Sequence, residues 1–446
     1  MYWKLKVSGY GKIEHAEIEV APLTLFVGDN NSGKSYLMSL LWGIQNFGME
    51  DLLYGEGMEE EKQVADWMKK QIAVAQEQGI CAVCVNEIHD MLQIVLDEGL
   101  KRNKSNLVKK IFNSIDVKIE QLQIILNDID KKSVTFEVAK DNENGKEWLH
   151  LGDDNKVQFA VPLSNKNSFG SDHDMVSTLL GLITGLHLWN MRDFNFDVYL
   201  PAVRTGFMLT KDIVNKVGRN TAFNLVAEQR EVTPFIRPIN QFLDVMNDLT
   251  FDGKGNTKFE NITAYLESSM AEGTIEVSMM PNRDVLYVPT NLESGMPLRV
   301  VSAVVTELSP LILILKHKKN LKTLFYEEPE MCLHPQLQHK MARVICQLIN
   351  AGLKMVITTH SDIVLQHINN MIRLSERGDM EDICQQYGYQ ASDLMRADNV
   401  KVYQLKSGSG GKTKVKEITC GKNGFAIPTF NEALDRIMEE AYTIQE

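Results

Sequence analysis

The sequence predicts an α/β protein with a mixed β-sheet core that is interrupted by a helical insertion. At both ends of the chain, short apolar runs that end in polar residues alternate with stretches of helical periodicity. Between residues 49 and 132 the chain instead becomes rich in Glu, Lys, Gln, Ile and Leu and contains no Pro. We therefore predict a core formed by residues 1–48 and 133–446, with a coiled-coil-like helical insertion at 49–132.

The order of elements follows from the local patterns. Alternating or apolar runs predict strands at 3–7, 17–20, 23–27, 133–138, 157–161, 197–200, 274–278, 284–288, 323–326, 355–359, 401–405 and 414–418. Helical periodicity predicts helices at 36–42, 174–190, 211–249, 302–316, 335–350 and from about 431. Within the insertion, apolar residues spaced by three and four also favour a helix, namely Ile111, Ile115, Ile119, Leu122 and Ile125.

Composition excludes several classes of protein. The chain of 446 residues has 47 Lys and Arg against 59 Asp and Glu, a net charge of −12, so nucleic-acid binding would require a local basic patch. No apolar run approaches the roughly 20 residues that span a bilayer, and the amino terminus lacks a signal-peptide pattern. We expect a cytoplasmic protein without membrane association.

Six cysteines are too few for a disulfide scaffold, so we expect free thiols. Cys81 and Cys84 are a zinc or redox pair or, as the pattern favours, two buried helix residues.

A phosphate-binding loop follows the third predicted strand. Residues 28–35 match G-x-x-x-x-G-K-[ST] and lead into a predicted helix, which is the context that this motif requires. Backbone N–H groups of such a loop surround phosphate oxygens, Lys34 reaches the β- and γ-phosphates, and Ser35 binds Mg²⁺. The residues expected to contact ATP are therefore Gly28, Asp29, Asn30, Asn31, Ser32, Gly33, Lys34, Ser35 and Tyr36.

Two further strands end in residues that suit nucleotide chemistry. The run at 324–330 is an apolar strand followed by acids, of which Glu327 is expected to bind Mg²⁺ and Glu328 to act on the attacking water. The alternative is a strand end with solvated acids. His360 ends the next strand, so it should reach the same sheet edge and contact the γ-phosphate or the water. Lys34, Glu328 and His360 are the predicted catalytic residues, although a lone histidine is usually structural.

Together these motifs resemble the ABC-type P-loop ATPases of the SMC, RecF and OLD-like group. The matching residues are Gly28–Ser35, Glu327-Glu328-Pro329-Glu330 with Leu333-His334-Pro335, and Thr359-His360-Ser361. The run E-P-E-x-x-L-H-P resembles standalone, defence-associated members of the AAA family, as do residues 201–206 and 426–430. The resemblance implies ATP and Mg²⁺ as cofactors and a homodimer that closes around two nucleotides, or a higher homo-oligomer.

The sequence departs from that group in three places. No L-S-G-G-Q signature is present, and Ser302 holds its place at the start of a predicted helix, where it contacts a partner's nucleotide or serves as a plain N-cap. Ser294-Gly295 is the competing position. Glu327 replaces the usual Asp, and Arg204 is our choice for the region of the missing Q-loop glutamine.

The sequence leaves two main interpretations of function. The first is an ATPase that dimerises and controls a separate effector, a nuclease or a toxin, in prokaryotic anti-phage defence or genome maintenance. The second is a nucleotide-gated scaffold with negligible turnover; an SMC/RecF-like DNA-repair ATPase is a further alternative, and a transporter subunit fits poorly. No D-x-D acidic cluster or histidine cluster follows His360, so we expect the effector on another chain. The basic residues at 101–110 form a solvated helix face or a docking site for an acidic partner or nucleic acid.

Overall fold

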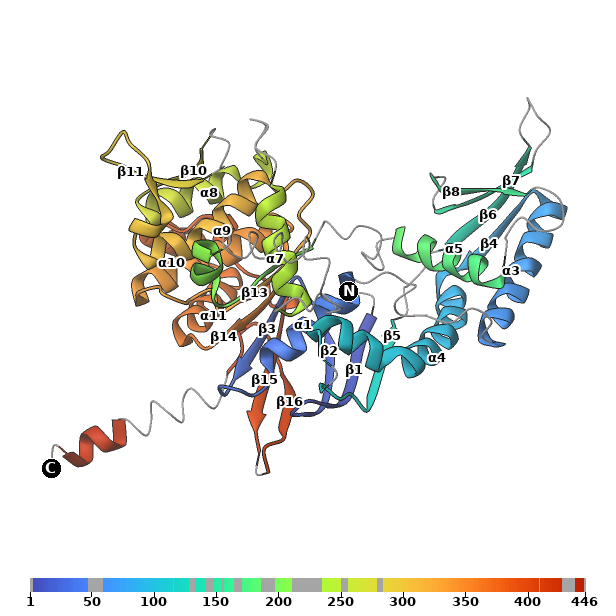
Figure 1. Ribbon diagram of the computed structural model, residues 1–446, viewed down its shortest axis with the longest axis horizontal. Coiled ribbons are helices and arrows are strands. Elements are labelled where there is room, and N and C mark those ends of the chain that lie inside the picture. Colours follow the sequence, from blue (N-terminus) through green and yellow to red (C-terminus); the bar gives the residue numbers. More distant parts are fainter. Residues whose placement is uncertain are drawn as a thin grey trace, which may run out of the picture. The chain divides into compact units, whose positions relative to one another are not determined.

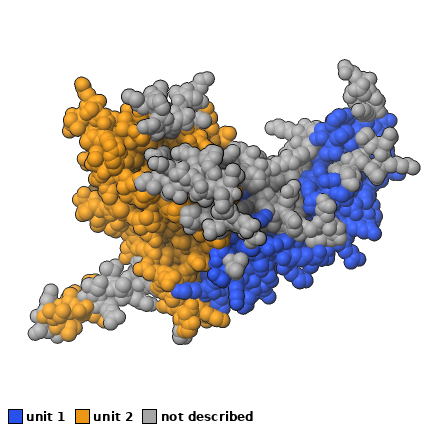
Figure 2. All heavy atoms as spheres, in the orientation of Figure 1, with its two compact units in different colours: residues 1–19, 43–110, 114–194 blue, residues 20–42, 111–113, 195–446 orange. Residues whose placement is uncertain are grey.

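The computed structural model describes residues 3–46, 59–114, 116–127, 133–140, 147–153, 156–163, 171–185, 197–210, 235–249, 256–278, 284–408, 410–426 and 438–444. The chain divides into two compact units (Figures 1 and 2). Unit 1 comprises residues 1–19, 43–110 and 114–194, and unit 2 comprises residues 20–42, 111–113 and 195–446. The predicted helix start at 49–58 and the motif residues 427–430 lie outside the described residues.

Unit 2 is built on a mainly parallel sheet. Its strands lie in the order β16-β15-β3-β14-β13-β9, and only β16 runs antiparallel to its neighbour. Their bounds are β3 Leu23–Gly28, β9 Asp197–Leu200, β13 Thr323–Glu327, β14 Lys354–Thr359, β15 Val400–Ser407 and β16 Thr413–Ile418. Every residue of β3, β9 and β13 is buried, as expected for strands covered on both faces.

Helices and a small sheet complete unit 2 (Figure 1). The α-helices are α1 Lys34–Asn46, which starts in this unit, α7 Arg237–Asp248, α8 Glu260–Leu266, α9 Ala303–His317, α10 Pro335–Asn350, α11 Asp362–Ser375 and α12 Met380–Tyr387. Residues 204–210 are also helical. The antiparallel sheet contains β10 Gly273–Val277, β11 Val285–Pro289 and β12 Met296–Pro297. Short turns of 3₁₀- or π-helix are η1 Thr257–Phe259, η2 Glu267–Ala271, η3 Leu298–Val300, η4 Ala391–Asp393 and η5 Ala397–Asn399.

Among its described residues, unit 1 contains two sets of antiparallel strands and three helices. One set has the order β5-β1-β2, with bounds Gln121–Leu126, Trp3–Tyr10 and Ile13–Glu19. The other has the order β4-β6-β7-β8, with bounds Ile80–Cys84, Ser133–Lys140, Glu147–Asp153 and Lys156–Leu163. The helices are α3 Glu59–Gln78, α4 Val85–Phe112 and α5 Asp172–Gly185.

The helical prediction for residues 111–125 is wrong beyond Phe112. Helix α4 ends there because Asn113 adopts a left-handed φ of 50°, a conformation that stops helices. The chain then forms β5, which pairs with β1 and buries Leu122 and Ile124 on one face. The spacing of three between Ile119 and Leu122 therefore arises from a loop and a strand.

The helical prediction for the two neighbouring cysteines is also wrong. Cys81 and Cys84 lie on β4, which pairs with β6, and Cys84 is exposed. Both are free thiols, and a separation of three residues directs their side chains to opposite faces of a strand. In the part of the chain that the structure describes, no cluster of three or more His, Cys, Asp or Glu side chains is arranged to hold a metal ion.

Candidate nucleotide site

The loop between β3 and α1 has the backbone of a phosphate cradle. Gly28 and Gly33 have φ values of 128° and 98°, which side-chain-bearing residues rarely adopt. A Cβ atom on Gly28 would lie 2.0 Å from the carbonyl oxygen of Leu405 on β15. The Asp29 carboxylate accepts a hydrogen bond from the N–H of Ser407, at 3.0 Å. Strand β15 therefore fixes one side of the loop.

The side chains of the loop give it a polar interior and an exposed outer side. Lys34 is buried, and its ammonium group donates to the carbonyl oxygens of Gly28, at 3.1 Å, and Asp29, at 2.7 Å. The buried Ser32 hydroxyl has no hydrogen-bond partner among the described residues, whereas Ser35 is exposed. An anion seated in the loop would accept from the Ser32 hydroxyl and from the third N–H of the Lys34 ammonium group, so these residues fit a polyphosphate.

Glu327 is held at the end of β13 by the neighbouring strand β9. Its carboxylate accepts hydrogen bonds from the Tyr199 hydroxyl, at 2.8 Å, and the N–H of Ala202, at 2.9 Å. Tyr199 in turn lies 3.4 Å from the hydroxyl of Ser39 on α1. The carboxylate oxygens keep further lone pairs, so Glu327 fits as a ligand to Mg²⁺, directly or through water.

Glu328 has an unusual backbone conformation, and hydrogen bonds hold both its N–H and its carbonyl group. Its φ of 41° is left-handed, a conformation that costs a non-glycine residue energy and recurs at functional sites. The Glu328 N–H donates to the carbonyl oxygen of Thr358 on β14, at 2.9 Å, and its own carbonyl accepts from Arg204, at 3.0 Å. Burial, followed by the charge of Glu327, raises the pKa of the Glu328 carboxyl.

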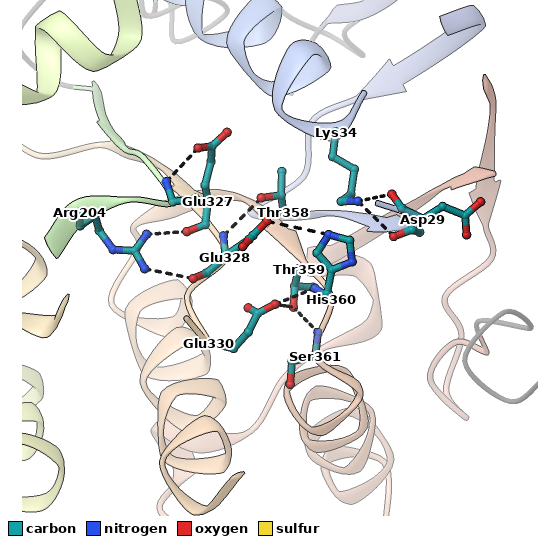
Figure 3. A network of polar contacts seen from close by, with 12 residues as sticks. Asp29, Lys34, Arg204, Glu327, Glu328, Glu330, Thr358, Thr359, His360 and Ser361 are labelled. Carbon is teal, nitrogen blue, oxygen red and sulfur yellow. Dashed lines mark hydrogen bonds and ion pairs between the residues drawn. The ribbon is translucent and has the colours of Figure 1, made fainter. Parts of the chain in front are cut away.

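His360 lies opposite Glu328 at the same edge of the sheet (Figure 3). Its Nε2 is 3.9 Å from Glu328 Oε1. Burial and the nearby Lys34 lower the pKa of His360, so its ring is neutral at pH 7 and is able both to donate and to accept. The sequence predicted that His360 lies at the same edge of the sheet as Glu328, and the structure places it there.

Glu330 fixes the backbone that carries His360. Its carboxylate accepts from the N–H of His360, at 2.6 Å, and from the Thr359 hydroxyl, at 2.9 Å. Its second oxygen is buried without a hydrogen-bond partner in the described chain, and burial raises the pKa of the carboxyl. Glu330 belongs to the acidic run of the sequence, but the sequence analysis predicted no role for it. The E-P-E spacing is the sequence signal that could have indicated one.

Arg204 and Ser302 have local partners that the sequence did not indicate. Arg204 is fully buried and donates to main-chain carbonyls, including that of Glu327 at 2.6 Å. Ser302 is exposed and caps α9 by accepting from the N–H of Val305, at 3.5 Å. A nucleotide contact for either residue stays a prediction. Tyr36, the last predicted contact, is 42% exposed and stacks on Phe112 with ring centroids 4.8 Å apart.

The fold and the site together define a P-loop ATPase of the ABC type, as the sequence predicted. The family model described as the AAA ATPase domain matches residues 1–159 and 231–365, and the chain belongs to this family. No curated protein matches the sequence.

The solved structures that match this chain include three Smc head domains. An Smc head bound to the C-winged helix domain of ScpA has 13% identity and a TM-score of 0.40, covering 95% of this chain and 99% of that chain. The SMC head domain from Thermotoga maritima has 11% identity and a TM-score of 0.34, covering 94% and 99%. An Smc head with an extended coiled coil bound to the C-terminal domain of ScpA, from Pyrococcus furiosus, has 12% identity and a TM-score of 0.39, covering 99% and 99%.

None of the helices that the structure describes is both long and apolar enough to cross a membrane.

Proposed function

We propose that the chain binds ATP with Mg²⁺ and hydrolyses it, with Glu328 as the general base. The observation that carries the proposal is the meeting of three strand ends in one sheet, which brings a P-loop lysine, two acids and a neutral histidine to the same edge. Ligands of open α/β sheets bind at this carboxyl edge. Family membership supports the nucleotide as ATP.

Each residue has a distinct task in this proposal. The loop N–H groups and Lys34 hold the phosphates, and Ser35 with Glu327 holds Mg²⁺, which neutralises charge on the phosphate oxygens. Glu328 accepts a proton from the attacking water, and its raised pKa makes it a stronger base than an ordinary glutamate. His360 donates a hydrogen bond to the γ-phosphate or the water.

Phosphate release by the purified chain tests this proposal. Glu328→Gln should keep ATP affinity and lose about 10²–10⁴-fold in kcat, because the amide keeps the shape but not the base. Lys34→Ala should lose binding of a fluorescent ATP analogue, because the charge facing the phosphates is removed. Glu381→Gln, an exposed acid on α12, and the exposed Lys412→Ala are matched controls. Undiminished turnover in Glu328→Gln would exclude Glu328 as the base.

A scaffold with negligible turnover is the second candidate, and one observation favours it. Both carboxylate oxygens of Glu327 already accept hydrogen bonds, one from Tyr199 on β9 and one from Ala202 after it, which leaves fewer lone pairs for a metal. Both candidates predict ATP binding. Tight binding of the ATP analogue without steady-state phosphate release by the wild-type chain would favour the scaffold.

We also propose that nucleotide state controls a separate effector, with the chain working as a dimer in anti-phage defence or genome maintenance. The motif E-P-E-x-x-L-H-P supports this role through its resemblance to defence-associated ATPases. Plasmid DNA and RNA incubated with the purified chain, ATP and Mg²⁺ or Mn²⁺ should stay intact. Cleavage by this chain alone, lost in a variant outside the ATPase motifs, would contradict the separate effector.

A further inference from the structure

The further inference concerns Arg204, which lies at the start of the helical turn after β9. Its side chain is 0% exposed and contacts three main-chain carbonyls. Nη1 donates to Pro201 O, at 2.7 Å, and to Glu327 O, at 2.6 Å, while Nη2 donates to Glu328 O, at 3.0 Å. The guanidinium therefore clasps the backbone that carries both acids of the nucleotide site (Figure 3).

A buried cation in this position requires a counter-charge, and Glu307 provides it. Arg204 and Glu307 form an ion pair in which both side chains are buried. Glu307 Oε2 also accepts from the hydroxyl of Thr205, at 2.7 Å, and from its N–H, at 3.2 Å. An unpaired buried charge would be strongly unfavourable, so the position of Arg204 depends on Glu307.

Arg204 contacts a residue whose backbone conformation is strained. Glu328 is in the left-handed region, and such a conformation persists only where surrounding contacts enforce it. Strand β14 holds the N–H of Glu328 through Thr358, and Arg204 holds its carbonyl. Loss of the second contact would let the peptide relax and move the carboxylate away from the attacking water.

Glu307 also belongs to a helix with an exposed start. It lies in the second turn of α9, and the helix begins at its cap Ser302, which is exposed. Contacts therefore join Glu307 to Arg204 and Arg204 to Glu328, and Ser302 begins the helix that carries Glu307. None of these residues other than Glu328 needs to contact the nucleotide of its own protomer.

We propose that Arg204 is a positioning residue that holds Glu328 in its productive backbone conformation, and that Glu307 ties this contact to helix α9. The inference rests on the proposed function, in which Glu328 is the base. It adds a residue pair that sets the turnover rate without binding ATP, and it makes the start of α9 the place where a partner surface would influence hydrolysis.

Two variants test the pair, with a third as a matched control. Arg204→Lys keeps the charge but not the fork that reaches several carbonyls, and Glu307→Gln keeps the shape but not the counter-charge. Asp393→Asn removes the charge that pairs with Arg343, 2.8 Å away, in another ion pair of unit 2. Asp393 is buried, whereas Arg343 is partly buried beside Tyr265 and Tyr389. This variant controls for the general cost of removing a buried carboxylate from an ion pair.

The expected result is a split between kcat and KM. Both test variants should keep affinity for a fluorescent ATP analogue and keep KM, but lose on the order of 10²-fold in kcat, because a small displacement of a catalytic group costs this much. Asp393→Asn should keep kcat. Wild-type kcat in both test variants, or an equal loss in Asp393→Asn, would overturn the proposal. Should a variant fail to fold, Thr205→Val removes only one hydrogen bond to Glu307 and should show a smaller loss of kcat.

Amide hydrogen exchange gives a readout that does not depend on turnover. Exchange in a peptide covering residues 324–333 should accelerate in Glu307→Gln and stay unchanged in Asp393→Asn. If the wild-type chain releases no phosphate but exchange changes as expected, the proposed hydrolysis fails while the positioning role stands. Unchanged exchange in Glu307→Gln overturns the positioning role, whatever the activity of the wild-type chain.

Discussion

At the scale of single residues, burial narrows the pH range in which the site is correctly charged. Burial lowers the pKa of Lys34 to about 8, although Glu328 and Asp29 partly oppose this shift. Burial and the charge of Glu327 raise the pKa of Glu328. Lys34 is charged below its pKa and Glu328 is ionised above its own, so the active form of the free protein exists only between the two values.

This arrangement predicts a bell-shaped dependence of kcat/KM on pH, since kcat/KM reports the free enzyme. The value should fall above about pH 8, where Lys34 loses its proton, and should fall on the acid side at a pH above the usual range of a glutamate. At saturating ATP the alkaline limb of kcat should move upward, because bound phosphates favour the charged lysine. A kcat/KM that is constant from pH 7 to about 9.5 would contradict the assignment of Lys34.

Glu330 leads to a second prediction at this scale, because an uncharged oxygen can also accept the hydrogen bonds that its carboxylate accepts from the His360 N–H and the Thr359 hydroxyl. Glu330→Gln keeps an oxygen that accepts from the His360 N–H, so ATP turnover should stay close to that of the wild type. Glu330→Ala leaves this buried donor unpaired and should lower the free energy of unfolding by about 1–3 kcal/mol, together with kcat. Denaturant unfolding and phosphate release measure the two effects. Equal effects of the two substitutions would show that the charge, not the hydrogen bond, matters.

At the scale of elements, strand and helix positions that depend on local pattern were predicted well. Helix α10 was predicted at 335–350 and has these bounds, because Pro335 suits the first helical turn and Gly352 follows its end with a φ of 80°. Strands β4 and β5 were missed because they form through pairing with β6 and β1, partners that lie far along the chain. The local periodicity of a segment does not indicate which distant strand it pairs with.

The contact between the phosphate loop and β15 gives a prediction for these elements. Gly28→Ala places a Cβ atom 2.0 Å from the Leu405 carbonyl oxygen at a φ of 128°, so the loop must move. We expect a loss of ATP-analogue binding and a destabilisation of more than about 2 kcal/mol. Gly388→Ala is the matched control, since its φ is 68° but nothing lies within 4 Å of its Cβ, so only about 1–2 kcal/mol is expected. Full binding by Gly28→Ala would contradict the cradle geometry.

At the scale of the whole molecule, the site is assembled from segments that are distant in sequence. Motifs that are continuous in the chain identified Lys34, Glu327, Glu328 and His360. The contributions of Tyr199 and Glu307 were missed, because each acts on a residue more than 100 positions away. Their side chains carry no motif of their own, so only the folded chain reveals them.

The proposed dimer leads to the last prediction. Glu328→Gln should accumulate as a dimer in ATP and Mg²⁺, because it binds ATP but does not hydrolyse it. Each copy carries a net charge of −12, so two copies repel one another and association should strengthen when salt is raised from about 0.05 to 0.3 M. Sedimentation velocity measures this, with ADP and the double variant Lys34→Ala/Glu328→Gln as controls that should stay monomeric. A Glu328→Gln variant that binds the ATP analogue but remains a monomer at all salt concentrations would exclude closure of two copies around the nucleotide.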